Sequence, residues 1–457
     1  MLSLPDHVLA FMHTFQKAGY RIYLVGGAVR NLLLLGETED WDFAVSARPE
    51  QILELFPDGF YNNTFGTVGI PVETNGTKHV FEVTTFRKES DYTDSRRPDS
   101  VEWTDSIEED LARRDFTINA IAYDGSVLVD PFSGCKDLER KVIRAVGNPD
   151  TRFAEDALRL LRAVRFATVL SFEIEAETRE SLIRNADRIL NISWERIRDE
   201  FFRILVSRDP AGGVLLLREL GLLRYILPEV EAAFAIDQKS PMRHHKYDVG
   251  THLVESLRFC PSEKAIVRFA ALIHDIGKVP TYRKNPRSGL VTFYNHEVVG
   301  KHMAEAIAER FKLSNAEKEK LVKLVEHHQF TVSELQTDKA LRRFIRNVGK
   351  ENLQDMLDLR TGDRIGSGAK PTSWRYELFK QRLEEVQHEP FSVKDLKING
   401  HDVMEIFSLR PSRKIGEILD KIFTEVIEAG LPNDRETLLK RLREVKADQS
   451  SKNASSE

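Results

Sequence analysis

Two aspartates separated by one residue, Asp40 and Asp42 in the stretch DWDFAV, are the first candidates for chemistry. In a β-strand, side chains two positions apart point to the same side, so both carboxylates converge on one point. Two like charges held together repel each other, and one of them is driven to bind a proton unless a cation lies between them. Because Mg²⁺ prefers carboxylates together with substrate phosphates, the pair predicts a magnesium site for phosphoryl transfer by two metals.

A glycine pair and an arginine precede the aspartates in the stretch LVGGAVR. Gly26 and Gly27 close an apolar run and open a helical pattern. Because glycine has no side chain, the backbone can approach a triphosphate there, and the amides at the helix start face the anion. Arg30 lies one turn further on, where its guanidinium can reach a phosphate oxygen.

A third carboxylate often completes a site of this kind. Glu82 in HVFEVTTF and Asp115 in RRDFT are both candidates. The sequence does not distinguish between them, so both remain open at this point.

The elements that must position these residues alternate along the first 150 residues. Four stretches are typical of strands, namely RIYLVG at 21–26, WDFAV at 41–45, TVGIPVE at 67–73 and HVFEVTTF at 79–86. Two others predict helices, AVRNLLLL at 28–35 and PEQILELF at 49–56. From about Asp150 onward, patterns of helical period dominate, such as AEDALRLLRAVRFATVL at 154–170. The sequence therefore predicts an α+β protein with a small mixed sheet at 1–150, followed by an all-α remainder.

The composition favours a globular protein of two to four domains. The chain has 457 residues, of which 41% are hydrophobic and 30% are charged, and its net charge is −5. Its two cysteines exclude a disulfide framework and fit a reducing compartment. No apolar run approaches the roughly 18 residues that a membrane span needs, and the N-terminal stretch is a poor signal peptide. We therefore expect a cytoplasmic protein without a membrane segment.

Three motifs, in order, resemble those of a known family: LVGGAVR with DWD, then LARRDFTINAIAYD at 111–124, then EDALRLLRAVRFA at 155–167. They are similar to the motifs of bacterial class II tRNA nucleotidyltransferases, which comprise the CCA-adding enzymes and the related bacterial poly(A) polymerases. The resemblance runs from about residue 20 to 230. It implies a catalytic head with a five-stranded nucleotidyltransferase sheet, and a helical neck at 151–235 that carries the nucleotide-selecting helix.

The resemblance also implies roles for single residues. Asp40 and Asp42 match the catalytic pair that holds Mg²⁺. The residues that match nucleotide-binding positions of the family are Gly27, Arg30, Arg114, Asp156, Arg159, Arg162 and Arg165.

Helix geometry predicts how the residues expected to select the nucleotide lie relative to one another. On one continuous helix, Asp156 and Arg159 lie about 60° apart on one surface. An aspartate accepts a hydrogen bond from the exocyclic amine of cytosine or adenine, and an arginine donates to neighbouring base acceptors. Guanine and uracil lack an amine at that place, so the pair would reject both. Arg162 and Arg165 turn further round the helix, and we expect them to bind phosphate or to hold Asp156 in place.

The leading interpretation is template-independent addition of C and A to the 3′ end of tRNA. The 3′ hydroxyl of tRNA would attack the α-phosphate of CTP or ATP, and pyrophosphate would leave. The polar, turn-rich stretch 87–110 resembles a flexible element that the family needs for switching from C to A addition. Within the fold, an A-adding specialist or a poly(A) polymerase is the alternative. From another class, the alternative is a phosphohydrolase whose N-terminal half only binds nucleotide or RNA, although the intact DWD argues against it.

A second constellation lies in the C-terminal half. His252, His274 with Asp275 in ALIHDIGK, and Asp363 follow the H…HD…D order of the HD phosphohydrolase superfamily. Imidazoles and carboxylates on facing helices suit a divalent metal, whose identity the sequence leaves open. His296, with either His327 or His328, could add ligands for a second metal. The resemblance implies an HD-type helical domain at 236–385 with phosphohydrolase activity.

The end of the chain is expected to form a helical tail at 386–445 and a disordered terminus at 446–457. The segment GHDV…LRPSRKIG resembles a helix-turn unit that would hold the tRNA elbow, and a pure packing role is equally open. The expected partners are tRNA, CTP and ATP.

Overall fold

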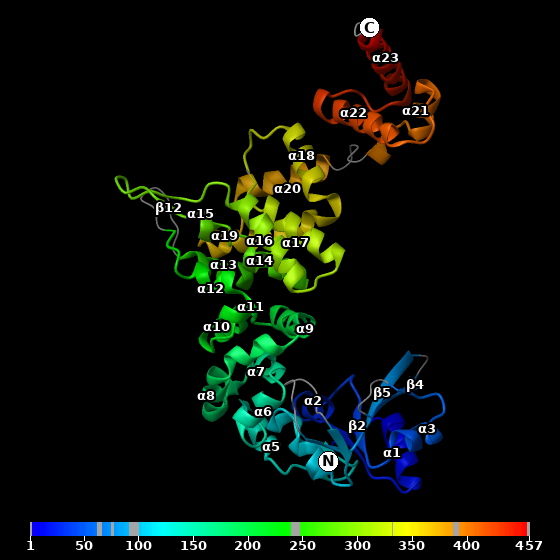
Figure 1. Cartoon of the computed structure of the whole chain (residues 1–457), viewed down its shortest axis with the longest axis vertical. Coiled ribbons are helices and arrows are strands. Elements are labelled where there is room, and N and C mark those ends of the chain that lie inside the picture. The colour runs from blue at the N-terminus through cyan, green and yellow to red at the C-terminus, as the bar shows by residue number, and fades with distance from the viewer. Residues whose placement is uncertain are drawn as a thin grey trace. The chain divides into compact units, whose positions relative to one another are not determined.

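The chain folds into two compact units in a computed structural model, which describes residues 2–61, 66–74, 77–90, 100–238, 247–330, 332–386 and 393–454. The first unit comprises Met1–Ala235 with Glu309–Lys312, and the second comprises Ile236–Ala308 with Leu313–Glu457. Figure 1 shows strands gathered in the first unit and helices through the second. The predicted α+β class is therefore confirmed.

One mixed sheet forms the centre of the head, in the strand order β3-β4-β5-β2-β1-β8-β9. The strands are β1 Ile22–Val25, β2 Asp42–Val45, β3 Phe60–Tyr61, β4 Thr67–Thr74, β5 Thr77–Thr85, β8 Ala122–Tyr123 and β9 Leu128–Val129. β2 and β5 run parallel, whereas the other neighbours are antiparallel. The sheet has seven strands where the resemblance implied five, because the two-residue strands β3 and β9 extend its edges.

Helices α1 (Asp6–Lys17), α2 (Gly27–Leu35) and α3 (Pro49–Leu55) accompany this sheet. The contact of α1 with the sheet is aromatic. The ring of Phe11 lies 5.0 Å from the rings of both Phe43 and Phe81 and 5.1 Å from that of Phe56. Such clusters contribute dispersion and ring-quadrupole attraction beyond their buried area, so this core fixes the strands that carry the acid pair.

The structure describes two parts of the polar stretch 87–110. β6 (Arg87–Ser90) and β7 (Ser100–Trp103) pair as an antiparallel hairpin, and α4 follows at Ile107–Ala112. Residues 91–99, at the centre of the expected flexible element, lie outside the described residues. The 3₁₀ turn η1 (Thr117–Asn119) completes the head beside β8.

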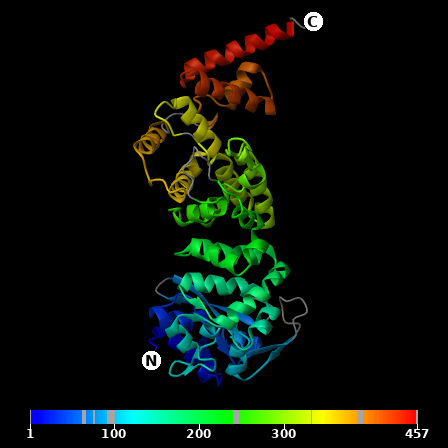
Figure 2. The same cartoon turned by 90° about the vertical axis from the view of Figure 1, so that its left-hand side faces the viewer.

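The neck consists of short helices that follow one another away from the sheet (Figure 2). They are α6 Pro149–Glu155, α7 Leu158–Leu170, α8 Ala176–Arg184, α9 Trp194–Leu205, α10 Pro210–Glu219, α11 Leu223–Ile226 and α12 Pro228–Ala233. The preceding head segment ends with α5 (Gly134–Arg140) and β10 (Val142–Ile143), and β10 pairs in parallel with β11 (Glu173–Ile174) of the neck.

The continuous helix expected over 154–170 is interrupted at Asp156. This residue is extended, with φ −139° and ψ 103°, between the end of α6 and the start of α7. Its Oδ1 accepts a hydrogen bond from the backbone N–H of Leu158 at 3.0 Å. A short acidic side chain that binds a nearby backbone amide competes with the helical ladder, which explains the break.

Within the described residues of the second unit, the regular structure is helical apart from one short hairpin, β12 (Arg283–Lys284) with β13 (Val291–Thr292). Its first helices are α13 Val249–Arg258, α14 Ala265–Ile273, α15 Lys278–Thr281, α16 His296–Arg310, α17 Asn315–His327, α18 Asp338–Val348, α19 Leu353–Gly366 and α20 Trp374–Val386. α21 (Gly400–Phe407), α22 (Arg413–Ala429) and α23 (Arg435–Ala454) then share an apolar core that includes Val403, Ile422 and Leu438.

The disordered terminus expected from residue 446 is not found over the described residues, because α23 continues to Ala454. Once a helix has been nucleated, adding further residues is inexpensive even for a polar sequence, since each contributes one hydrogen bond. Among the residues that the structure describes, none of the helices combines the length and apolar character needed to cross a bilayer.

Replacing Phe81 by alanine should remove the centre of the aromatic core and destabilise the head by about 3–5 kcal/mol. Phe81 is fully buried, whereas its neighbour Val80 on the other face of β5 is half exposed. Scanning calorimetry should therefore show one unfolding transition moved to lower temperature in Phe81→Ala and almost no change in Val80→Ala. Equal shifts in the two variants would contradict this account of the core.

Candidate functional site

A hollow of about 470 Å³ in the first unit brings the predicted head and neck residues together. Every residue that the sequence placed at a catalytic or nucleotide-binding position lines it, namely Gly27, Arg30, Asp40, Asp42, Arg114, Asp156, Arg159, Arg162 and Arg165. Two arginines that the sequence analysis did not single out, Arg196 and Arg203 of α9, also line it. The hollow thus combines a carboxylate pair with a dense set of cations.

The acid pair lies where β2 begins. Asp40 is exposed just before the strand, and Asp42 is its first residue. Burial, followed by repulsion from Glu82, raises the pKa of Asp42 to about 6, and the charge of Asp40 adds to this effect. Asp42, Glu82 and Asp40 therefore disfavour one another's charged forms at this point of the hollow, a local conflict that a divalent cation relieves.

Glu82, rather than Asp115, lies beside this pair. In the parallel pairing of β2 with β5, Glu82 is the register partner of Asp42. Asp115 is buried elsewhere in the hollow, where its Oδ2 accepts from Nε of Arg162 at 2.7 Å and its Oδ1 accepts from Nδ2 of Asn119 at 3.0 Å. Although burial alone would raise its pKa, Arg162 and Asn119 lower the pKa of Asp115 to about 2. Asp115 is an ion-pair partner, so Glu82 is the better candidate for a third metal ligand.

The glycine pair gives an arginine room to approach the helix start. Gly26 has φ 66° and ψ −130°, a conformation that favours glycine, and α2 begins at Gly27. A Cβ at Gly26 would lie 2.9 Å from Nη1 of Arg114. Arg30, on α2, donates from Nη1 to Oδ1 of Asn119 at 2.7 Å. Both guanidiniums are therefore held near the amides that open α2.

A buried acid that the sequence analysis missed positions the RRDFT arginines. The side chain of Asp110 on α4 has no exposed surface, and it pairs with Arg113 at 2.9 Å and Arg114 at 3.2 Å. Although burial would raise it, these two guanidiniums hold the pKa of Asp110 below its usual value. The signal was present in the sequence, since an acid three and four residues before two arginines shares a helix face with them.

Asp156 and Arg159 both reach the hollow, but not through a shared helix surface. Arg159 donates from Nη1 to Oε2 of Glu155 at 2.6 Å and from Nη2 to the carbonyl of Arg113 at 2.9 Å. Asp156 instead accepts from Nη2 of Arg196 at 2.8 Å. The helix-face argument for the pair was therefore wrong, because the helix is broken between them.

Arg162 and Arg165 do not hold Asp156 in place. Arg162 is paired with Asp115, and Nε of Arg165 lies 3.0 Å from Oε2 of Glu200 on α9. Phe166 lies under both guanidiniums, 5.3 Å from that of Arg162 and 4.2 Å from that of Arg165. With these contacts, both guanidiniums line the hollow.

The second constellation converges in the second unit. Asp275, just after the end of α14, is the centre of the cluster. Its Oδ2 lies 3.3 Å from Nε2 of His252 and 3.4 Å from Nε2 of His274, and its Oδ1 lies 3.3 Å from Nε2 of both His296 and His328. Asp363 of α19 lies 3.4 Å from His252. Two groups, one with His252 and His274 and one with His296 and His328, thus share Asp275 and could each hold a metal ion.

Backbone carbonyls orient three of these imidazoles. Nδ1 of His274, His296 and His328 lies 2.9, 2.9 and 2.6 Å from the carbonyl oxygens of Ala271, Phe293 and Val325. Such contacts place the proton on Nδ1 and leave Nε2 as a ligand facing the cluster. Of the two adjacent histidines that the sequence left open, His328 therefore faces Asp275.

Glycines allow the helices around this cluster to approach closely. A Cβ at Gly366 of α19 would lie 2.6 Å from the backbone nitrogen of Ser256 on α13. A Cβ at Gly277 would lie 2.0 Å from the carbonyl oxygen of His296. Because real Cβ atoms do not come so close to backbone atoms, glycine is required at both positions for His252, Asp363 and His296 to meet.

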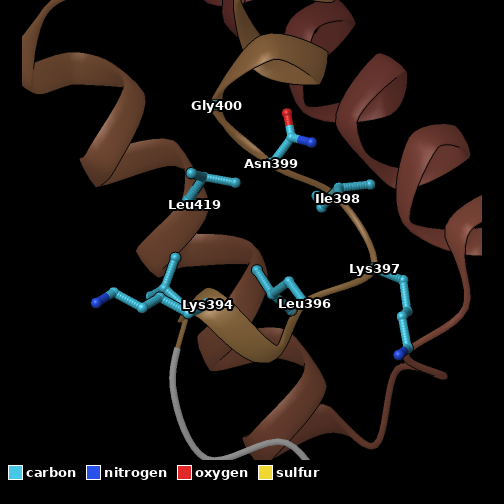
Figure 3. Close-up of a pocket in the computed structure, with 8 residues that line it drawn as sticks. Lys394, Leu396, Lys397, Ile398, Asn399, Gly400 and Leu419 are labelled. Atoms are coloured by element: carbon cyan, nitrogen blue, oxygen red, sulfur yellow. The ribbon is translucent and has the colours of Figure 1, made fainter.

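Another hollow, of about 510 Å³, lies in the tail and offers no comparable chemistry. It is lined by apolar side chains such as Leu396, Ile398 and Leu419, together with Lys394 and Lys397. Figure 3 shows the two lysine side chains extending in different directions. No carboxylate or imidazole is among its described lining residues, so it carries no catalytic set.

Three family models match the chain. A Poly A polymerase head domain matches residues 22–144, an RNA and SrmB-binding site of polymerase A matches 171–234, and a tRNA nucleotidyltransferase domain 2 matches 291–442. These matches cover the head, the neck and most of the second unit in the order in which the chain presents them.

Full-length relatives are similar to the chain. The A-adding tRNA nucleotidyltransferase of Deinococcus radiodurans is 32% identical, with 92% of this chain and 95% of the relative covered. The CCA-adding enzyme of Lactococcus lactis is 33% identical, with 97% and 99% covered. Among solved structures, that of the Bacillus stearothermophilus CCA-adding enzyme in complex with CTP has a TM-score of 0.69 at 26% identity and covers 98% of both chains.

The raised pKa of Asp42 predicts a pH-dependent effect of Asp42→Asn on stability in EDTA. Below about pH 4 the carboxyl is protonated in both the folded and the unfolded chain, whereas above pH 6 the folded chain must carry an unfavourable charge. Stability associated with this group is therefore lost between about pH 4 and 6. Asp42→Asn should stabilise the protein by about 2–3 kcal/mol at pH 8 and hardly at all near pH 4.

Thermal unfolding at the two pH values measures this difference. Asp58→Asn, a change at an exposed head position, is the matched control and should behave like the original protein at both pH values. A loss of stability in Asp42→Asn at pH 8, or an equal gain at both pH values, would contradict the charge conflict described above.

Proposed function

Because this chain belongs to the family of tRNA nucleotidyltransferases that includes the CCA-adding enzymes, we propose that it adds C and A nucleotides to the 3′ end of tRNA with CTP and ATP as substrates. The observation that carries the proposal is the single hollow in which Asp40 and Asp42 face a set of arginines. In this reaction the 3′ hydroxyl of tRNA attacks the α-phosphate of the nucleotide, and pyrophosphate leaves.

Asp40, Asp42 and Glu82 are the residues that would hold Mg²⁺. The raised pKa of Asp42 supports this assignment, since burial and the neighbouring carboxylates Glu82 and Asp40 disfavour its charge, and a divalent ion bound between them would stabilise that charge. When bound there, Mg²⁺ supplies charge neutralisation for the attacking hydroxyl and the departing pyrophosphate. The three carboxylates would determine where the positive charge of the ion lies, next to the glycine turn that precedes α2.

The cations of the hollow would bind the triphosphate, and Asp156 would read the base. Arg30 and Arg114 lie next to the start of α2, where backbone amides also face an anion. Asp156 can accept from the exocyclic amine of cytosine or adenine, which uracil and guanine do not present. With Asp156 fixed, the protein itself would select the nucleotide without a template.

An extension assay on three tRNA transcripts, ending before CCA, after CC and after CCA, tests this function. With Mg²⁺, CTP and ATP, we expect the bare transcript to grow by three nucleotides and then stop. Extension of only the CC transcript by ATP would identify an A-adding specialist, and unlimited A tails would identify a poly(A) polymerase. Asp42→Asn should lower the rate by at least about 1,000-fold, since removal of a charged transition-state stabiliser costs several kcal/mol.

The control for this assay is Asp58→Asn, which should retain full activity. An absence of nucleotide addition by the original protein on all three transcripts would overturn the proposed function. Near-normal addition by Asp42→Asn would overturn the catalytic assignment alone.

The buried cluster around Asp275 favours a second activity, a metal-dependent phosphohydrolase in an HD-type domain at 236–385. Four imidazoles and two carboxylates are a donor set that suits a divalent transition metal. Imidazoles whose Nδ1 atoms contact backbone carbonyls present Nε2 as a ligand. Residues 386–445 would then form the tail. The ligands assigned are His252, His274, Asp275 and Asp363, with His296 and His328 for a second ion.

His274→Ala should remove metal from this cluster without affecting nucleotide addition. Metal content after exposure to Mn²⁺, Ni²⁺ or Zn²⁺ and gel filtration should fall by at least one ion per chain in the variant. His302→Ala, at an exposed histidine of α16, is the control and should keep the metal. Equal metal content in His274→Ala and the original protein would overturn the site, as would an original protein that retains none of the three metals.

A further inference from the structure

We propose that Arg196 is a specificity-determining positioning residue, which fixes the Asp156 carboxylate so that uracil and guanine are excluded. The proposal rests on the proposed function and names a residue that no motif or spacing in the sequence pointed to. Arg196 lies on α9, 40 positions beyond Asp156, and lines the same hollow.

The Asp156 carboxylate is held by two different elements. Its Oδ1 accepts from the backbone N–H of Leu158 at 3.0 Å, and its Oδ2 accepts from Nη2 of Arg196 at 2.8 Å. Because Asp156 is extended and lies between two helices, no helical backbone sets the direction of its side chain. These two contacts must therefore orient it. Only the contact with Arg196 can be removed by changing a side chain.

Arg196 contacts Asp156, but another of its own hydrogen-bond donors lacks a partner. Its Nη1 is buried and makes no hydrogen bond to any residue that the structure describes. A buried charged donor without a partner is unfavourable, so an arginine in this position needs a compensating interaction. The charge-assisted contact with Asp156 is that interaction. Packing alone would be served better by an apolar side chain.

Without Arg196, the carboxylate has a competing cation to turn towards. Arg162 of α7 interacts electrostatically with Asp156 and lies in the same hollow. Arg159 offers no replacement contact, since it donates to Glu155 and to the backbone carbonyl of Arg113. A carboxylate drawn towards Arg162 would leave the place where it meets the base.

The orientation of this carboxylate decides which bases are accepted. Cytosine and adenine present an amine that donates to a carboxylate oxygen, whereas uracil and guanine present a carbonyl oxygen that a fixed carboxylate repels. If the carboxylate can turn away, the repulsion is lost and the wrong bases enter. Loss of Arg196 should therefore damage selectivity more than it damages the chemical step.

The test measures kcat and KM for CTP, ATP, UTP and GTP on tRNA transcripts with Arg196→Ala and Arg196→Lys. In Arg196→Ala we expect UTP use relative to CTP to rise by at least about tenfold, with KM for CTP and ATP raised and kcat changed less. Arg196→Lys, which keeps a cation, should restore part of the selectivity. Arg198→Ala is the matched control on the same helix, where Arg198 contacts Asp199 and the carbonyl of Lys312.

A double-mutant cycle separates positioning from general support of the fold. If Arg196 acts through Asp156, then Arg196→Ala should not change selectivity further in an Asp156→Ala background. An equal fall in kcat/KM for all four nucleotides in Arg196→Ala would overturn the proposal. If Arg196→Ala does not fold, Arg196→Gln replaces it, and unchanged selectivity in that variant would overturn the proposal equally. Absence of any addition by the original protein would instead be a failure of the proposed function.

Discussion

The ion pair between the buried Asp115 and the partly buried Arg162 joins the head to the neck, and both residues line the hollow. Asp115 belongs to the head, just before η1, and Arg162 belongs to α7. Removing one partner of such a pair leaves an uncompensated charge away from water, so the two elements are held at one relative position. This contact places the start of α7, and with it Asp156, on the hollow that Asp42 lines.

The arginines that line the hollow would repel one another if none of them were paired. Instead, acidic side chains around the hollow form ion pairs with them. Asp110 holds the RRDFT pair, Asp115 holds Arg162, and Glu200 lies against Arg165. The acids fix the guanidiniums without any ligand, so the binding of a triphosphate, as proposed, would need little reorganisation. The same carboxylates limit net charge in the cavity while leaving the cationic groups at its surface.

The two candidate sites use different structural means to bring acids together. In the head, strand pairing places Asp42 beside Glu82, at the start of β2. In the second unit, the ligands come from several helices and their ends, and glycines at 277 and 366 permit the close approach. In both, donor groups that suit a divalent cation are brought together by the fold itself.

The sequence by itself determined the local features of this protein. The closeness of Asp40 and Asp42, the glycine turn before α2 and the H…HD…D order follow from spacing, although β2 begins only at Asp42, so Asp40 does not share a strand face with it. Only the tertiary structure decided between Glu82 and Asp115, selected His328 over His327 and brought Arg196 to Asp156. The physical reason is that ion pairs form between side chains of elements far apart in the chain, and their strength depends on distance and burial. Arg162, for example, pairs with Asp115, which leaves Glu82 as the candidate metal ligand.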